Sequence, residues 1–148
     1  EATEFAEQVH KTVALSAYRS SVVMANRYSE LINQQLPKKN GLPYFDAIIL
    51  GIGLDGHTAS IFSSCNFLLN DTRSYAVAVH PESKQLRITL TGPVILNSTP
   101  LLVPVIGENK KAIFERLLEA RTITESFPAA CIMYRAASTS VFTDIKER

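Results

Sequence analysis

The chain has 148 residues, of which 46% are apolar and 20% are charged, and 15 basic against 14 acidic side chains leave a formal net charge of +1. This length and composition are typical of a single globular domain whose core is large enough to be stable without disulfides or structural metals. The balanced charge argues against a nucleic-acid binder, and no apolar run approaches the ~20 residues that span a bilayer. Cys65 and Cys131 form no CxxC pair, so we expect neither a disulfide scaffold nor a zinc site, and we expect a cytoplasmic location.

The first half of the chain predicts a helix followed by a buried strand. Residues 1–19 are ambiguous between a helix and an extended segment, whereas residues 20–36 repeat apolar side chains at a period near 3.6 and predict a helix. A polar turn follows at 37–41. The continuous apolar run at 46–50 fits a strand that is covered on both faces, as in parallel sheets.

The second half alternates further strands with short helices. Together these elements predict an α/β fold with a mainly parallel sheet flanked by helices. The expected strands are 74–80, 86–91, 101–106, 129–134 and 140–142, and the expected helices are 94–97 and 109–120.

A glycine-rich turn, Gly51-Ile-Gly-Leu-Asp-Gly56, follows the strand at 46–50, and residues 57–62 then predict the start of a helix. Ligands of open α/β sheets bind beyond the carboxyl ends of the strands, and a helix start offers free N–H groups to an anion. The GxGxxG pattern also fits a nicotinamide-dependent oxidoreductase. That function requires an acidic residue about 20 positions later, at the end of the next strand, and neither Asp71 nor Glu82 is well placed.

His57 lies directly after the last glycine of this turn, where a dinucleotide loop needs no imidazole. Histidine titrates near neutral pH and can take a proton from water, so we expect His57 to act as a general base. Asp55 could orient the ring or a substrate hydroxyl, and it could equally be a cap or turn residue. Loop N–H groups between Gly53 and Thr58 could stabilise an oxyanion.

The string Gly51-Ile-Gly-Leu-Asp-Gly-His-Thr-Ala-Ser-Ile-Phe62 resembles the signature of the 6-phosphogluconolactonases. Four later features are similar to that family in the same order. These features are Arg87-Ile-Thr-Leu-Thr91, Asn97, the step from Gly107 to Lys110-Lys111-Ala112, and Phe127-Pro-Ala-Ala130.

Related glucosamine-6-phosphate deaminases share the glycine core but typically continue with Ile-Ala-Phe-Asn-Glu-Pro.

The resemblance implies a Rossmann-like fold and hydrolysis of 6-phospho-D-glucono-1,5-lactone to 6-phosphogluconate, without a metal or cofactor. His57 and Asp55 would be catalytic. Substrate would be bound by Arg87, by Lys110 or Lys111, and by loop residues. Arg87 would be costly to bury on an apolar strand, so it needs either an anion or an acidic partner. The loop residues are Gly51, Gly53, Gly56 and Thr58.

The family also carries upstream motifs, a Ser-Gly-Gly turn and an Asp-Glu-Arg segment, that are absent from these residues. We therefore expect residues 1–148 to form one α/β domain that is incomplete at its amino end, lacks its first strands and is weakly active or inactive alone. A non-catalytic phosphosugar-binding module is a further alternative. The oligomeric state is open. Cys131 is expected in the core, and His10 and His80 are expected to be structural or at the surface.

Overall fold

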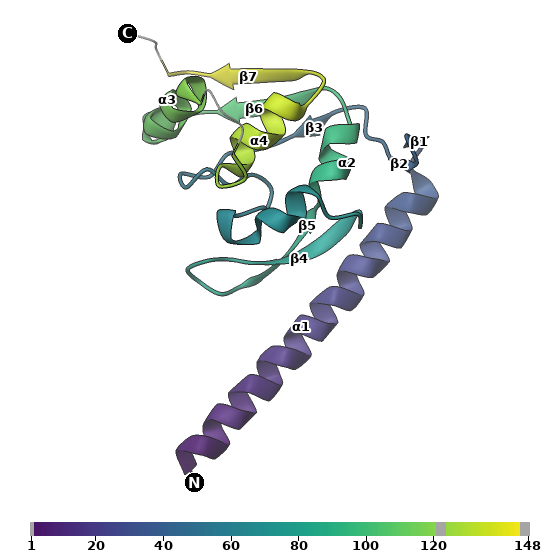
Figure 1. Ribbon diagram of the computed structural model, residues 1–148, viewed down its shortest axis with the longest axis vertical. Helices are drawn as coiled ribbons and strands as arrows, with labels where there is room; N and C mark the ends of the chain where they lie inside the picture. The colour runs from purple at the N-terminus through teal and green to yellow at the C-terminus, as the bar shows by residue number, and fades with distance from the viewer. Residues whose placement is uncertain (1, 121–123, 146–148) are drawn as a thin grey trace.

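The computed structural model describes residues 2–120 and 124–145, with residues 2–10, 12 and 13 as backbone only. It opens with one 34-residue helix, α1 (Ala2–Gln35), so the helix expected at 20–36 is real and also includes the ambiguous residues before it. The carboxyl-terminal part of α1 packs along a β-hairpin, while its amino-terminal turns extend past the rest of the molecule (Figure 1). Buried Ala25 marks the packed face.

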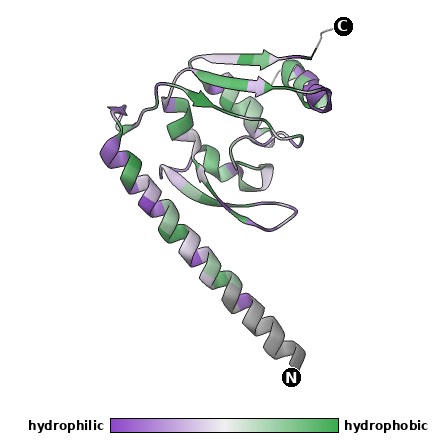
Figure 2. Ribbon diagram, turned by 180° about the vertical axis from the view of Figure 1, so that it is seen from behind, coloured by the Kyte–Doolittle hydropathy of each residue, from purple (hydrophilic) through white to green (hydrophobic). Residues whose placement is uncertain are grey.

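Two polar side chains tie α1 to the start of that hairpin. Ser29 Oγ accepts the N–H of Tyr75 at 2.8 Å, and Asn33 Nδ2 donates to Ser74 Oγ at 3.0 Å. Figure 2 shows that α1 alternates hydrophobic and hydrophilic residues along its described length. Among the described ranges, no helix is long and apolar enough to cross a membrane.

A small antiparallel pair, β1 (Lys38–Lys39) and β2 (Leu42–Pro43), follows α1. Asn97 holds this pair, because its side-chain N–H groups donate to the carbonyls of Lys39, Leu42 and Pro43 at 2.8–3.2 Å. Asn97, which was quoted above for the family resemblance, therefore stabilises the β1–β2 pair.

The central sheet has three parallel strands in the order β3 (Ile48–Ile49), β6 (Leu101–Val105) and β7 (Thr139–Thr143). Alternate side chains of β6 are buried on one face of this sheet. The other face is more exposed, and Ile49 on it is 72% exposed. Because the strands are parallel, their carboxyl ends lie at the same edge.

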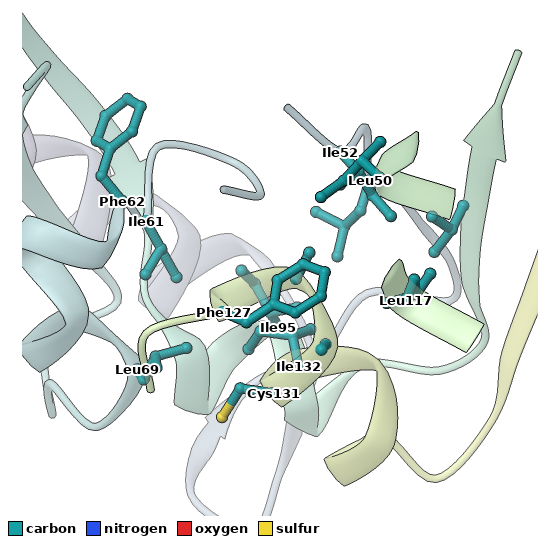
Figure 3. Close-up of a cluster of buried hydrophobic side chains, with 14 of the residues drawn as sticks. Leu50, Ile52, Ile61, Phe62, Leu69, Ile95, Leu117, Phe127, Cys131 and Ile132 are labelled. Carbon is teal, nitrogen blue, oxygen red and sulfur yellow. The ribbon is translucent and has the colours of Figure 1, made fainter. Parts of the chain in front are cut away.

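β4 (Tyr75–Val79) and β5 (Leu86–Leu90) form a separate antiparallel hairpin. Between the parallel sheet and this hairpin lie α2 (Gly92–Asn97), α4 (Pro128–Arg135) and the 3₁₀ segment η1 (Ser63–Leu69) (Figure 1). Their side chains fill the core shown in Figure 3. The predicted α/β class with a parallel sheet flanked by helices is confirmed, with three strands in that sheet and two in the hairpin.

The prediction of a strand at 129–134 was wrong, because this segment belongs to the helix α4. Residues 129–132 are all at least 98% buried, so their apolar run had no period that could tell a strand from a buried helix. Pro128 occupies the first turn, where proline favours a helix. Cys131 is in the core, as expected.

The helix expected at 109–120 is confirmed as η2 (Glu108–Lys110) continuing into α3 (Lys111–Glu119). Ile113, Phe114 and Leu117 bury its apolar stripe. The helix expected at 94–97 corresponds to α2. Gly107, with φ of +95°, makes the turn between β6 and η2.

Candidate functional site

Three segments meet at the edge where the parallel strands end. The glycine turn 51–56 follows β3, the turn from Gly107 to Lys110 follows β6, and Asp144 follows β7. The Lys110 ammonium donates to the carbonyl of Ile52 at 2.5 Å, which joins the first two segments across 58 residues of sequence. This edge is where open α/β sheets bind their ligands.

The expectation that residues 57–62 begin a helix was wrong. Ile52 and Thr58 form an isolated antiparallel bridge, Thr58 and Ile61 form another, and helical structure begins only at Ser63. Ala59 has φ of +51°, which lies outside the right-handed helical region. The anion site inferred from a helix start at His57 therefore has no structural basis.

Thr58 is only 2% exposed, and its hydroxyl donates to the carbonyl of Gly51 at 2.9 Å. The N–H of Gly53 donates to the carbonyl of His57 at 2.9 Å, and the N–H of Gly56 donates to the carbonyl of Gly53 at 3.0 Å. These groups close the turn on itself. Thr58 thus has a structural partner, and three of the amides considered for an oxyanion, those of Gly53, Gly56 and His57, are already engaged.

Two glycines make room for side chains. A Cβ on Gly53 would lie 2.1 Å from His57 Nδ1 and 2.6 Å from Asp55 Oδ1, and one on Gly56 would lie 2.7 Å from the Phe127 ring. Gly56 also has φ of +90°, which favours glycine. A Cβ on Gly51 would meet no atom within 4 Å.

Asp55 and His57 form a pair at the end of this turn. Asp55 Oδ1 lies 2.5 Å from His57 Nδ1 and also accepts the backbone N–H of His57 at 3.2 Å. Burial alone would raise the pKa of the Asp55 carboxyl, but the hydrogen bonds from His57 outweigh it and lower the pKa overall. The His57 side chain is 30% exposed, so solvent reaches the ring.

The other side of the His57 ring contacts Phe62, a residue that sequence reasoning gave no role beyond the signature string. The two ring centroids are 4.7 Å apart, and Phe62 is 3% exposed. His80 meets Phe62 edge-on at 5.1 Å, and its Nδ1 accepts the N–H groups of Glu82 and Ser83. His80 is therefore structural, as expected. The side chain of His10 lies outside the described part.

Arg87 is exposed on β5, and its guanidinium donates to Gln85 Oε1 at 2.9 Å. Because Arg87 is exposed, the cost of burying it does not arise, and burial gives no reason to expect an anion or an acidic partner there. Thr89, two residues later and so on the same face of the strand, accepts the N–H of Ser60 through its Oγ1 at 3.1 Å. Arg87 thus shares the face of β5 that meets the segment following His57.

Lys110 and Lys111, which the sequence could not separate, have different surroundings. The Lys110 ammonium reaches the glycine turn, whereas Lys111 begins α3. Asp144, which sequence reasoning missed, accepts the N–H of Gly107 at 2.8 Å. Its signal in the sequence is its position directly after the last strand.

Within the ranges that the structure describes, no three His, Cys, Asp or Glu side chains cluster in a way that could hold a metal ion. Cys131 is 2% exposed in the core, and His57 pairs with Asp55 rather than with a thiol.

Comparison with known proteins identifies related chains. Residues 3–141 match the family described as glucosamine-6-phosphate isomerases/6-phosphogluconolactonase. The 6-phosphogluconolactonase of Haemophilus influenzae is 36% identical over 119 residues, which cover 80% of this chain and 49% of that protein. The 6-phosphogluconolactonase of Bos taurus is 32% identical over 121 residues, covering 81% and 46%.

Comparison of the fold with solved structures also finds related proteins. The crystal structure of devB protein superimposes with a TM-score of 0.75 and 34% identity, covering 80% of this chain and 50% of that one. The chain thus spans about half the length of the relatives it matches. With a family match over residues 3–141 and a shared fold, the chain belongs to the glucosamine-6-phosphate isomerase/6-phosphogluconolactonase family.

Proposed function

We propose that the protein containing these residues hydrolyses 6-phospho-D-glucono-1,5-lactone to 6-phosphogluconate, with His57 as the general base. The observation that carries this proposal is the pair of Asp55 and His57 at the carboxyl ends of the parallel strands. The names of the relatives in Haemophilus influenzae and Bos taurus support the choice of substrate. No metal or organic cofactor enters the proposed reaction, and we place it in the cytoplasm.

The geometry suggests how the base is prepared. With its Nδ1–H donated to the Asp55 carboxylate, the His57 ring keeps an unprotonated Nε2 that can accept a proton. Phe62 on one side of the ring and the absence of a Cβ at Gly53 on another define where the ring lies. Proton removal by a positioned base accelerates a reaction by roughly 10²–10⁴-fold, a moderate demand that suits a reactive cyclic ester.

The reaction then proceeds in two balanced steps. Nε2 takes a proton from water while the water oxygen bonds to the lactone carbonyl carbon, which gives a tetrahedral oxyanion. The bond from that carbon to the ring oxygen then breaks, and the imidazolium returns its proton to the departing oxygen. The products are the free hydroxyl and a carboxylic acid, which ionises in water.

Cationic side chains would hold the anionic parts of the substrate. Arg87, on the strand face that meets the segment after His57, and Lys110, beside the glycine turn, are the candidates for the phosphate or the product carboxylate. The position of its ammonium favours Lys110 over Lys111. Gly51, Gly53 and Gly56 would contribute by letting the backbone approach the substrate closely.

The test is lactone hydrolysis by the natural-length gene product that contains these residues, with spontaneous hydrolysis subtracted. His57→Ala should lower kcat by about 10²–10⁴-fold. His80→Ala is the matched control, because it removes a histidine that contacts Phe62 and not the proposed base, and its loss should be far smaller. An unchanged kcat in a folded His57→Ala protein would reject the assigned base.

We further propose that the 148 residues alone hydrolyse the lactone weakly or not at all, because half the length of the relatives has no counterpart here. Full activity of this chain by itself would contradict that view. It would show that the contacts described here are sufficient for binding the phosphate.

The alternatives make different predictions. A nicotinamide oxidoreductase needs the glycine turn to open a helix, and residues 57–62 form none. Saturable micromolar NADH binding by the gene product would nevertheless favour it. Release of ammonia from glucosamine 6-phosphate would favour the deaminase alternative. Binding of 6-phosphogluconate without turnover of the lactone would favour a non-catalytic module.

A further inference from the structure

Asp144 connects the ends of two neighbouring strands. β6 and β7 run parallel with Val105 opposite Thr143, so the residues that follow both strands emerge side by side. The Asp144 carboxylate accepts the backbone N–H of Gly107 at 2.8 Å. This contact fixes the point at which the chain leaves β6 and turns toward Lys110.

The turn held by Asp144 is what places Lys110. Gly107 adopts φ of +95°, and its carbonyl accepts the N–H of Lys110 at 2.9 Å, which closes the η2 turn. From this turn the Lys110 ammonium reaches the carbonyl of Ile52. Asp144, Gly107, Lys110 and Ile52 thus form one continuous set of hydrogen bonds from the last strand to the glycine turn.

Asp144 is itself held in place although its side chain is exposed. Thr143 Oγ1 accepts the N–H of Ile145 at 3.0 Å, and Ile145 is 7% exposed against the core. The residues on both sides of Asp144 are therefore anchored, so its carboxylate does not need to order a free tail in order to meet Gly107.

We propose that Asp144 is a positioning residue: it holds the Gly107 turn so that the Lys110 ammonium stays over the glycine turn, where it can meet an anionic group of the substrate. The inference deepens the proposed function and rests on it for the identity of that anion. Asp144 does not touch substrate. Loss of one such hydrogen bond should weaken substrate binding about three- to tenfold and leave proton transfer by His57 intact.

The experiment is a double-mutant cycle of Asp144→Ala and Lys110→Met in the natural-length gene product. It is read in KM and kcat for the lactone and in the Kd for 6-phosphogluconate by calorimetry. We expect Asp144→Ala to raise KM and Kd about three- to tenfold, with kcat within about twofold, and to have no further effect once Lys110 is Met. Asp144→Asn keeps an acceptor oxygen for Gly107 and should restore binding.

Glu108→Ala is the matched control, because it removes an acidic side chain from η2 without touching the Gly107 contact, and KM should not change. If Asp144→Ala melts below the assay temperature, Asp144→Ser replaces it, and its short side chain should likewise fail to hold Gly107. Equal effects of Asp144→Ala with and without Lys110, or no effect on KM and Kd, would overturn the inference. Absence of lactonase activity in the unmutated protein would instead reject the proposed function, and the Kd arm of the cycle would still decide the role of Asp144.

Discussion

Gly53→Ala tests the position of the His57 ring with the smallest possible change. The added methyl group would lie 2.1 Å from His57 Nδ1, 2.2 Å from its Cε1 and 2.6 Å from Asp55 Oδ1. Ordinary contacts between such atoms are about 3.5–4.0 Å, so the ring must retreat by more than ~1 Å. The retreat would break the hydrogen bond between Asp55 and His57.

Gly53→Ala should mainly slow the chemical step. A misplacement of about 1 Å can reduce a rate by roughly 10²-fold, and we expect at least that loss in kcat for Gly53→Ala. The free energy of unfolding should fall by only about 1 kcal/mol, because the displaced pair is partly exposed to solvent. Initial rates of lactone hydrolysis and urea unfolding curves measure the two quantities.

Gly51→Ala is the matched variant for this experiment. It adds the same methyl group two residues earlier, where no atom lies within 4 Å, so kcat should stay within about threefold and any binding role of Gly51 should show in KM. A folded Gly53→Ala protein with the kcat of the unmutated protein would refute the reasoning. It would mean that the ring position seen here is not the one used in catalysis.

Two further predictions concern stability, and both are measured by urea unfolding. Gly56→Ala should lower the free energy of unfolding by about 2–4 kcal/mol, because it forces alanine to φ of +90° and places a Cβ 2.7 Å from the Phe127 ring; a loss below about 1 kcal/mol would contradict it. Asp71→Asn should reduce stability at neutral pH, because the hydrogen bonds from Arg73 lower the pKa of the Asp71 carboxyl below its usual 3.8. A lowered pKa stabilises the fold above 3.8 and loses that effect as the pH falls below it, so the two proteins should converge in acid; a constant difference down to low pH would contradict the assignment.

The sequence was most informative where a pattern repeats over many residues. The amphipathic stripe of α3 and the strand β6 were both predicted from their periodicity or length, and the structure has them within a residue or two. The helix α1 was predicted only from residue 20, because the apolar spacing before that point is irregular. Periodicity records which side of an element is buried, so it is lost where an element is buried all round, as in α4.

The candidate site was less predictable because its contacts are long-range. The pair of Asp55 and His57 lies within three residues, and the sequence placed the two side by side, at the end of the glycine turn and directly after it. Contacts that join residues far apart, such as Lys110 with Ile52 and Asp144 with Gly107, leave no local trace. The helix predicted after the glycine turn failed for a related reason: the amide of Ser60 is satisfied by the side chain of Thr89, 29 residues later.

The parallel arrangement of β3, β6 and β7 has a consequence for when the candidate site forms during folding. The segments that meet at one edge come from positions near 50, 107 and 144, so the chain between residues 50 and 144 must be in place before they converge. If Lys110 and the glycine turn bind an anion as proposed, that affinity should accordingly depend on the docking of β7 against β6. Binding of such a ligand would then report that β7 has docked.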